Sequence, residues 1–371
     1  MRFSRKGIGG SNPLVSAKVQ LSRERMDMTT RGEIMLREIA EIPRMLSDIA
    51  SQMQSNPVSS SFFDSDRFNS VVILARGTSD NAGHFLKYLI ETKLGLPCAL
   101  ASPSAATMYP TKFRYEKTLV VAISQSGRSE DLLVFAKAAK EGGAYLLSIT
   151  NNSESPLANL SDIHIPVLAG PELAVPATKS YVGQLMVSYL LTMQWAKEKH
   201  DANEVVSHAI EILAQQESIV EFAKKIEIDQ PLYVLGRGFS YPNAKEFALK
   251  LQETSLIPVQ GMSTSDFLHG PIASLHESSQ VVFMSPHHLP AESFGETPDR
   301  VRAVTNQLFW IGQCPTNQAK DQILRTPKSS SEITGSIVDA IAFQLLTQRI
   351  ALNNGLDPDS PKGLSKVTIT R

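Results

Sequence analysis

TLVVAISQSGRSEDL, residues 118–132, is the stretch around which the rest of the chain can be interpreted. It opens with an apolar run, Leu119–Ile123, and continues into the polar turn Ser124–Gly127. Apolar residues at helical spacing resume at Leu132 and continue to Ala139. This order predicts a buried strand, a tight turn and a helix, in that sequence.

The turn is rich in groups that bind anions. It carries the hydroxyls of Ser124, Ser126 and Ser129, the amide of Gln125 and a flexible glycine. Backbone N–H groups at a helix N-terminus have no partner within the helix, and the helix dipole favours a negative charge there. The alternative is that the serines only cap the helix, but one N-cap needs one hydroxyl. The sequence therefore favours a phosphate site without a metal ion.

Composition limits the class of protein. The 371 residues are 42% hydrophobic and 20% charged, which is typical of a folded protein of about two domains. The net charge of −1 and the lack of a dense Lys/Arg stripe argue against nucleic acid as a partner. The apolar runs have strand length, so no membrane span is expected. Cys98 and Cys314 lie in no CxxC motif or Cys/His cluster, which predicts free thiols in a cytoplasmic protein rather than a zinc or disulfide site.

The N-terminal region divides into two parts. Residues 1–27 are basic, contain Gly and Ser, and lack the apolar core of a secretory signal, so we expect a poorly ordered leader. In residues 28–60 apolar side chains recur at helical spacing, which predicts N-terminal helices with a break or kink at Pro43.

Strand-like and helix-like segments then alternate. Strands are predicted at 71–74, 97–101, 119–123, 145–149 and 163–167, with a helix from about His84 to Lys93 and a long helical region over 179–225. Strand–helix–strand units at this spacing indicate right-handed crossovers and a parallel sheet.

The pattern returns once later in the chain. Residues 231–240 repeat residues 71–79: an apolar strand, Arg-Gly, one residue, Ser, and then a helix, here over 243–255. Further strands are predicted at 281–284 and 307–311, and the turn after the first of these reads Ser-Pro-His-His, so only the first copy is expected to hold an anion. We predict an α/β fold of two doubly wound domains in tandem, at 61–222 and 223–354, with a tail at 355–371 over the active site.

Six stretches in this order carry a family resemblance. The chain resembles the sugar isomerase (SIS) family, and within it the isomerase half of glutamine–fructose-6-phosphate amidotransferase and its stand-alone deaminase relatives. The stretches are ARGTSDNAG at 75–83, ISQSGRS at 123–129, AGPELAVPATK at 169–179, LGRGFSYPNAKEFALKLQE at 235–253, HGP at 269–271 and the tail 357–366.

The resemblance implies a homodimer whose active sites lie near the interface and need no cofactor. It implies that Glu253 moves a proton between sugar C1 and C2, that Lys250 lies beside it, and that His269 opens the ring from the neighbouring subunit. Lys366 would fold over the sugar with the tail. The residues that match those holding the sugar 6-phosphate are Thr78, Ser79, Ser124, Gln125, Ser126 and Ser129. Arg128 and Ala177 depart from the family pattern, which often has Glu and Ser or Thr there.

Each proposed catalytic residue has a simpler interpretation. Glu253 could be a solvated helix residue, His269 could complete a turn before Gly-Pro, and Lys366 could be an ordinary charged tail residue. The chemistry nevertheless suits them. One carboxylate on one face of an open-chain sugar can transfer a proton between adjacent carbons. A histidine has a suitable pKa for acid–base work at the ring oxygen.

The expected function is that of a glucosamine-6-phosphate deaminase, which converts glucosamine 6-phosphate and water to fructose 6-phosphate and ammonia. Few residues precede the first predicted strand, and neither Cys98 nor Cys314 is placed as a glutaminase nucleophile, so we expect no internal ammonia supply from glutamine. The alternatives are an aldose–ketose phosphosugar isomerase, a galactosamine-6-phosphate deaminase, a fructosamine-6-phosphate deglycase and, in another class, a non-catalytic sugar-phosphate sensor. The motifs do not separate these sugars.

Overall fold

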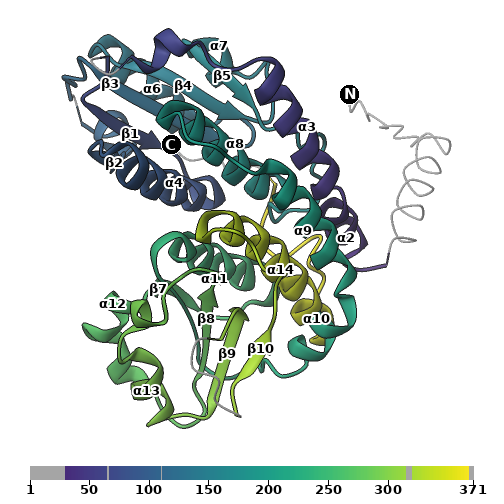
Figure 1. The fold of residues 1–371 in the computed structure, drawn as a ribbon. Coiled ribbons are helices and arrows are strands. Elements are labelled where there is room, and N and C mark those ends of the chain that lie inside the picture. Colours follow the sequence, from purple (N-terminus) through teal and green to yellow (C-terminus); the bar gives the residue numbers. More distant parts are fainter. Residues whose placement is uncertain (1–29, 65–66, 110, 315–319, 367–371) are drawn as a thin grey trace, which may run out of the picture.

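The fold consists of two parallel sheets stacked along a shared layer of helices (Figure 1). The structure is a computed structural model and describes residues 30–64, 67–109, 111–314 and 320–366. The leader predicted at residues 1–27 lies outside the described residues. The predicted class, two α/β doubly wound units in tandem, is confirmed.

The first sheet has five parallel strands in the order β2-β1-β3-β4-β5. Each predicted strand of this half is present. Their bounds are β1 Ser70–Leu74, β2 Cys98–Leu100, β3 Thr118–Ser124, β4 Tyr145–Thr150 and β5 Ile163–Pro166. The chain leaves β1 toward β2 on one side and returns to β3 on the other. The carboxyl ends of β1 and β3 therefore flank the switch point of the sheet, where open α/β folds bind ligands.

The helices of this half run antiparallel to the strands that they connect. They are α4 Gly77–Leu89, which continues as a π-helical turn at Ile90–Leu94, α5 Ser104–Thr107, α6 Glu130–Glu141, α7 Pro156–Leu160 and α8 Lys179–Ala196. The prediction that the first of these begins near His84 is wrong, because α4 begins at Gly77. Residues 77–83, which precede the predicted start, form its first two turns, where Ser79 and Asn81 are buried.

The second sheet repeats the topology of the first, with strand order β10-β9-β8-β6-β7. The strands are β6 Leu232–Gly236, β7 Gln260–Ser263, β8 Gln280–Ser285, β9 Gln307–Gly312 and β10 Gln322–Leu324. The helices are α11 Tyr241–Ser255, α12 Thr264–Leu268, α13 Thr297–Arg302 and α14 Glu332–Asn353. The sequence pattern did not predict β7, β10 or α14, but the internal repeat is confirmed by the matching strand orders.

Two helices lie between the sheets and join their cores. Nearly every residue of α8 and of α14 is buried, as expected of helices that are apolar on all sides. One apolar cluster runs through both halves and includes Val71 of the first sheet, Leu185 of α8, Phe343 of α14 and Val282 of the second sheet. The two halves therefore share one continuous core, which holds the first half fixed against α11 of the second.

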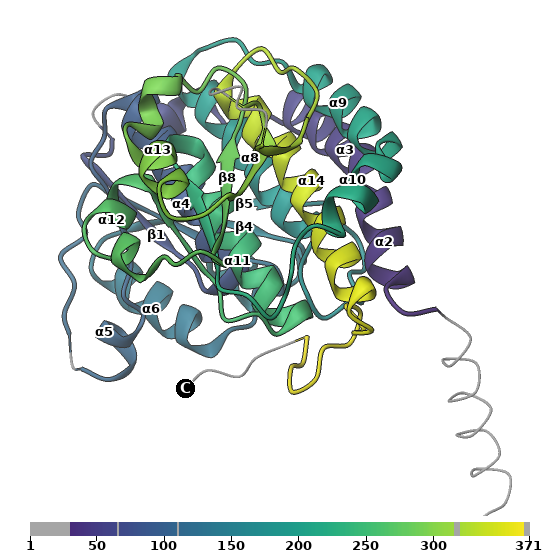
Figure 2. The same cartoon turned by 90° about the horizontal axis from the view of Figure 1, so that it is seen from below.

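The connecting and terminal segments pack on the outside of this core. They comprise α2 Glu33–Ala40, α3 Ile42–Ser55, α9 Ala202–Ala214 and α10 Gln216–Ala223. After α14 the chain turns back beneath the molecule (Figure 2). There Asp359 accepts the backbone N–H groups of Ile34 and Met35 at the start of α2, and its carbonyl accepts the N–H of Val175. These contacts fix the path of the tail before it reaches Lys366.

No helix in the described part of the chain has the length and apolar character needed to cross a bilayer.

Candidate active site

The serine turn after β3 is built so that its hydroxyls can donate. Gly127 has φ +62, and a Cβ there would lie 2.2 Å from the hydroxyl oxygen of Ser155, so this position needs glycine. The turn is closed by its own side chains: Ser124 Oγ accepts the N–H of Gly127 at 3.1 Å, and Ser126 Oγ accepts the N–H of Arg128 at 3.3 Å. Because both oxygens act as acceptors here, both hydroxyl hydrogens remain available for a ligand.

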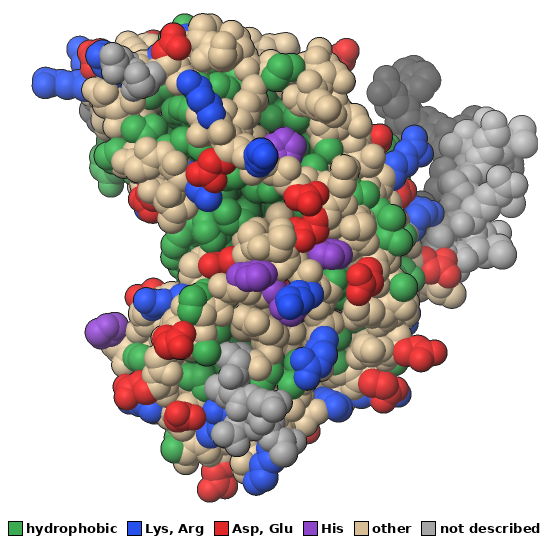
Figure 3. Space-filling view, viewed as in Figure 1, with side chains coloured by type: hydrophobic (Ala, Val, Ile, Leu, Met, Phe, Trp, Pro, Cys, Tyr) green, Lys and Arg blue, Asp and Glu red, His purple; other side chains and the backbone are tan. Residues whose placement is uncertain are grey.

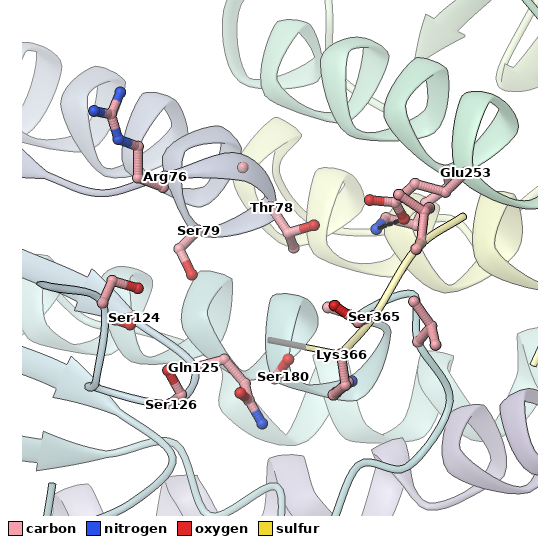
Figure 4. Close-up of a pocket in the computed structure, with 16 residues that line it drawn as sticks. Arg76, Thr78, Ser79, Ser124, Gln125, Ser126, Ser180, Glu253, Ser365 and Lys366 are labelled. Atoms are coloured by element: carbon pink, nitrogen blue, oxygen red, sulfur yellow. Dashed lines mark hydrogen bonds and ion pairs between the residues drawn. The ribbon is translucent and has the colours of Figure 1, made fainter. Parts of the chain in front are cut away.

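A second turn, at the end of β1, faces the serine turn. Gly77 adopts φ +54, and α4 starts there, so the N-termini of α4 and α6 lie on the two sides of the switch point. Ser79 Oγ accepts an N–H of Gln184 at 3.0 Å, which leaves its hydroxyl hydrogen free to donate. Arg76 is tied by its Nε to Asp131 at 2.8 Å, and Figure 4 shows its guanidinium turned away from the other labelled side chains.

Between these turns and α11 lies a cavity of about 410 Å³. Ser79, Ser124 and Ser126 lie on one side of it and Glu253 on the other, with Thr78 between them (Figure 4). The predicted site residues that line the cavity are Thr78, Ser79, Ser124, Gln125, Ser126, Ser129, Lys250, Glu253 and Lys366. A volume of this size suits a small polar ligand such as a sugar phosphate.

The far side of the cavity carries an acid–base cluster on α11. Glu246, Lys250 and Glu253 are spaced four and three residues apart, so they share one helix face. Lys250 Nζ lies 2.5 Å from Glu253 Oε2 and 3.4 Å from Glu246 Oε1. Lys250 and Glu246 are buried, whereas the Glu253 side chain keeps 22% of its surface exposed toward the cavity. Of the two carboxylates in this cluster, Glu253 is therefore the one that a ligand in the cavity can contact.

Burial sets the protonation of this cluster. It raises the pKa of Glu246 to about 7, against the opposing effects of Lys250 and of hydrogen bonds from Asn81 and Thr78. Burial alone would lower the pKa of Lys250, but the two neighbouring carboxylates outweigh it and the pKa is raised. Lys250 is therefore a buried cation held between two acids.

Glu246 was not predicted from the sequence. It lies at the interface of the two halves, where Thr78 Oγ1 donates to its Oε1 at 2.9 Å and Asn81 Nδ2 donates to its Oε2 at 2.7 Å. Thr78 was predicted as a phosphate ligand, and in this structure its hydroxyl is engaged by Glu246. The only hint in the sequence is the helical spacing of Glu246 from Lys250 and Glu253.

The tail reaches the cavity through Lys366. Its Nζ donates to Glu172 Oε2 at 2.9 Å and to the carbonyl of Ala174 at 2.7 Å. Glu172 is fully buried and also accepts the backbone N–H groups of Thr178 and Ser180. Burial alone would raise the pKa of Glu172, but Lys366 and these N–H groups outweigh it and lower the pKa. Glu172, which the sequence analysis missed, is thus an ionised anchor for the tail.

His269 lies apart from the other predicted residues. It is exposed at the C-terminal end of α12 and does not line the cavity of its own chain. Its predicted action from a neighbouring subunit stays a prediction.

Nucleophilic thiols and metal ligands do not gather at this site. Burial raises the pKa of Cys98 to about 12, which keeps that thiol protonated. Within the described ranges, no three His, Cys, Asp or Glu side chains are arranged to hold a metal ion. Among the described residues, the cavity offers hydroxyls, helix N-termini, the amide of Gln125, the ammonium of Lys366 and the Lys250–Glu253 pair.

Comparison with known proteins places this geometry in context. The model of the SIS domain matches residues 67–194 and 229–347. The isomerising glutamine–fructose-6-phosphate aminotransferases of Aquifex aeolicus and Gloeobacter violaceus are 32% and 33% identical to the chain, over 91% and 90% of its length. The chain spans only 57% and 58% of the length of these two relatives.

Two solved structures show the same fold. The C-terminal domain of glucosamine-fructose-6-phosphate aminotransferase from Francisella tularensis is 27% identical, with a TM-score of 0.78, and the match covers 90% of this chain and 99% of that one. Glucosamine-6-phosphate deaminase from Thermotoga maritima has a TM-score of 0.72 over 91% of this chain and 100% of that one, at 20% identity. The second likeness is one of fold alone.

Proposed function

The chain belongs to the SIS domain family, and from that premise we propose that it is a glucosamine-6-phosphate deaminase. The observation that supports this most is the cavity itself. It unites the hydroxyls and helix N-termini of the first half with the Glu253–Lys250 pair of the second half.

The proposed orientation puts the phosphate in the serine turn. Ser124, Ser126 and Ser79 each have a hydroxyl hydrogen available there, and the N-termini of α4 and α6 favour an anion. The sugar chain then extends across the cavity toward Glu253, and Lys366 lies along its edge.

Glu253 is the proposed base. Once the ring is open, its carboxylate takes the proton from C2, which carries the amine, and returns it to C1. The C1 carbonyl oxygen gains a proton and the C2 amine loses one, so the product carries a hydroxyl at C1 and an imine at C2. Lys250 provides a positive charge beside the carboxylate, since it contacts Glu253 at 2.5 Å. Ring opening is assigned to His269 of a second copy of the chain in a homodimer.

Water completes the reaction. It adds to the C2 imine and ammonia leaves, so glucosamine 6-phosphate and water give fructose 6-phosphate and ammonia. We assign this direction because the described site faces water and dilute free ammonia favours release by mass action. The same groups could serve an aldose–ketose isomerase, a galactosamine-6-phosphate deaminase or a fructosamine-6-phosphate deglycase.

The test measures ammonia release from glucosamine, galactosamine and fructosamine 6-phosphates, together with deuterium exchange at C2 in heavy water. We expect release and exchange with glucosamine 6-phosphate, and a fall of roughly 10²–10⁴-fold in Glu253→Gln because the base is lost. Glu332→Gln, a change to a half-buried glutamate that does not line the cavity, is the matched control.

Two outcomes would contradict the proposal. Isomerisation of hexose phosphates without ammonia release would favour the isomerase. Binding of sugar phosphates without exchange, or undiminished exchange in Glu253→Gln, would favour a non-catalytic sensor.

A further inference from the structure

One oxygen atom connects the two ends of the cavity. Glu246 Oε1 accepts the hydroxyl of Thr78 at 2.9 Å and also faces Lys250 Nζ at 3.4 Å. Lys250 Nζ in turn contacts Glu253 at 2.5 Å. A continuous polar path therefore runs from a residue of the predicted phosphate site to the proposed base, and every member of it belongs to α4 or α11.

We propose that Glu246 is a positioning residue that couples phosphate binding at Thr78 to the contact between Lys250 and Glu253. We call this chain of contacts the relay. The inference rests on the proposed function, since it assigns Glu253 as the base. It assigns this role to Glu246, and to Asn81 the role of holding the second carboxylate oxygen of Glu246. The sequence motifs suggested neither.

The relay depends on how many hydrogen bonds the Thr78 hydroxyl can donate. Thr78 has a single hydroxyl proton, so it can donate either to Glu246 or to a phosphate oxygen, and not to both. A phosphate dianion carries about two negative charges and three acceptor oxygens, so it competes for this proton with the single charge of the Glu246 carboxylate. Glu246 keeps its other donor, Asn81, on the opposite oxygen Oε2 at 2.7 Å. Only Oε1 loses its partner when the phosphate arrives.

Lys250 is the group placed to replace that partner. Its ammonium carries three N–H donors and already lies 3.4 Å from Oε1, just beyond a strong contact. Because Glu246 is fully buried, an unpartnered oxygen there is costly, which favours closure of this gap. As Lys250 moves toward Glu246, its hold on Glu253 weakens, and the carboxylate becomes free to accept the proton from C2.

The kinetic test is a double-mutant cycle of Thr78→Val and Glu246→Gln with glucosamine 6-phosphate. Because both changes break one relay, we expect each to lower kcat about tenfold and the double variant to be no slower than either, within about threefold. Glu246→Gln should leave KM and the Kd for inorganic phosphate within about twofold of wild type, whereas Thr78→Val should raise both.

Three further variants distinguish the relay from a general effect of substitution on the structure. Thr78→Ser retains the hydroxyl and should restore kcat. Thr92→Val and Glu332→Gln, which change an exposed threonine of the same chain segment and a half-buried glutamate away from the cavity, should leave kcat unchanged. Multiplicative losses of about a hundredfold in the double variant, or a rise in KM without a fall in kcat for Glu246→Gln, would overturn the relay.

A binding measurement tests the relay without any turnover. The side-chain ¹⁵Nζ signal of Lys250, assigned with Lys250→Arg, should shift as inorganic phosphate saturates the wild type and should not shift in Glu246→Gln. Phosphate binding to the wild type without this shift would refute the relay even if ammonia is released. The shift without ammonia release from any hexosamine phosphate would support the relay and refute the proposed reaction.

Discussion

The two Arg-Gly turns of the molecule have the same backbone conformation and differ in the groups that face them. Arg76 and Arg237 have nearly identical dihedrals, φ −142 and ψ 151 against φ −142 and ψ 149, and the glycines that follow have φ +54 and +56. In the first half the next residue is Thr78, which lines the cavity. In the second half it is Phe239, whose N–H donates to the carboxylate of Glu332 at 2.9 Å. The second half thus supplies its own anion where the first leaves room for a ligand.

The helices that follow these turns also differ, and here the second half carries the ionisable residues. Counted from the Arg-Gly pair, Phe85 and Leu89 of α4 occupy the positions of Glu246 and Lys250 in α11. Phe85 and Leu89 are fully buried core residues, whereas Glu246 and Lys250 form the buried ion cluster. The two copies of the fold thus differ, because hydroxyls that line the cavity lie in the first and the Glu246–Lys250–Glu253 cluster lies in the second.

The turns after β3 and β8 also keep a similar backbone and differ in their side chains. Gly127 and His288 occupy equivalent left-handed positions, with φ +62 and +67, so the backbone of the turn is retained although the sequence is not. Where the first half has Ser126, the second has His287. Burial lowers the pKa of His287, and nearby His288, Lys328 and His208 lower it further. Figure 3 shows several histidine side chains near the middle of this face, with acidic as well as basic side chains around them.

The largest expected effect comes from blocking the first turn. Ser126→Leu places an apolar side chain among the phosphate hydroxyls, so we expect no measurable binding of inorganic phosphate or glucosamine 6-phosphate by calorimetry. His287→Leu makes the matching change in the second half and should leave binding intact. Unchanged phosphate affinity in Ser126→Leu, with a cooperative melting transition, would show that the anion binds elsewhere.

A smaller effect is expected from the glycine of the same turn. Gly127→Ala combines a left-handed backbone, which costs roughly 1–2 kcal/mol for a residue with a Cβ, with the 2.2 Å approach to Ser155 Oγ. We expect phosphate affinity to fall about tenfold as the turn relaxes. His288→Ala leaves a Cβ at a position that already has one, and should not change phosphate affinity. Equal losses in the two variants would mean that the effect is global and not local to the first turn.

Much of this division could be predicted from the sequence. Local patterns gave the strands of the first sheet, the serine turn and the repeat, because an apolar run followed by a polar turn and a helical period is visible within a few residues. The same logic predicted a ligand site at the serine turn, since ligands of open parallel sheets bind at the carboxyl ends of the strands. The resemblance to the family, and not a local pattern, implied Lys250, Glu253 and Lys366, which line the same cavity.

Interactions across the two halves could not be predicted in this way. Glu246, Asn81 and Glu172 are buried polar residues whose partners lie far away in the sequence, and no local pattern distinguishes them from solvated residues. The helix α14 was missed because it is apolar on all sides and so lacks the periodicity of a surface helix. The early start of α4 depends on the same tertiary contacts, since Asn81 in its first turns bonds to α11.

The smallest expected effect tests the internal carboxylate of the second half. Burial raises the pKa of Glu332, and the N–H of Phe239 lowers it by less. A carboxyl group with a raised pKa in the folded state holds its proton longer than in the unfolded chain. As pH rises above the usual glutamate pKa, this group therefore costs stability until it is ionised in both states. Glu332→Gln removes the titration, so the Tm of this variant relative to wild type should increase as pH rises above about 4, the usual range of a glutamate pKa. Phosphate affinity should stay constant, because the first half does not use this group. A Tm difference that is independent of pH, or that shrinks as pH rises, would mean that Glu332 does not titrate with a raised pKa beside the second Arg-Gly turn.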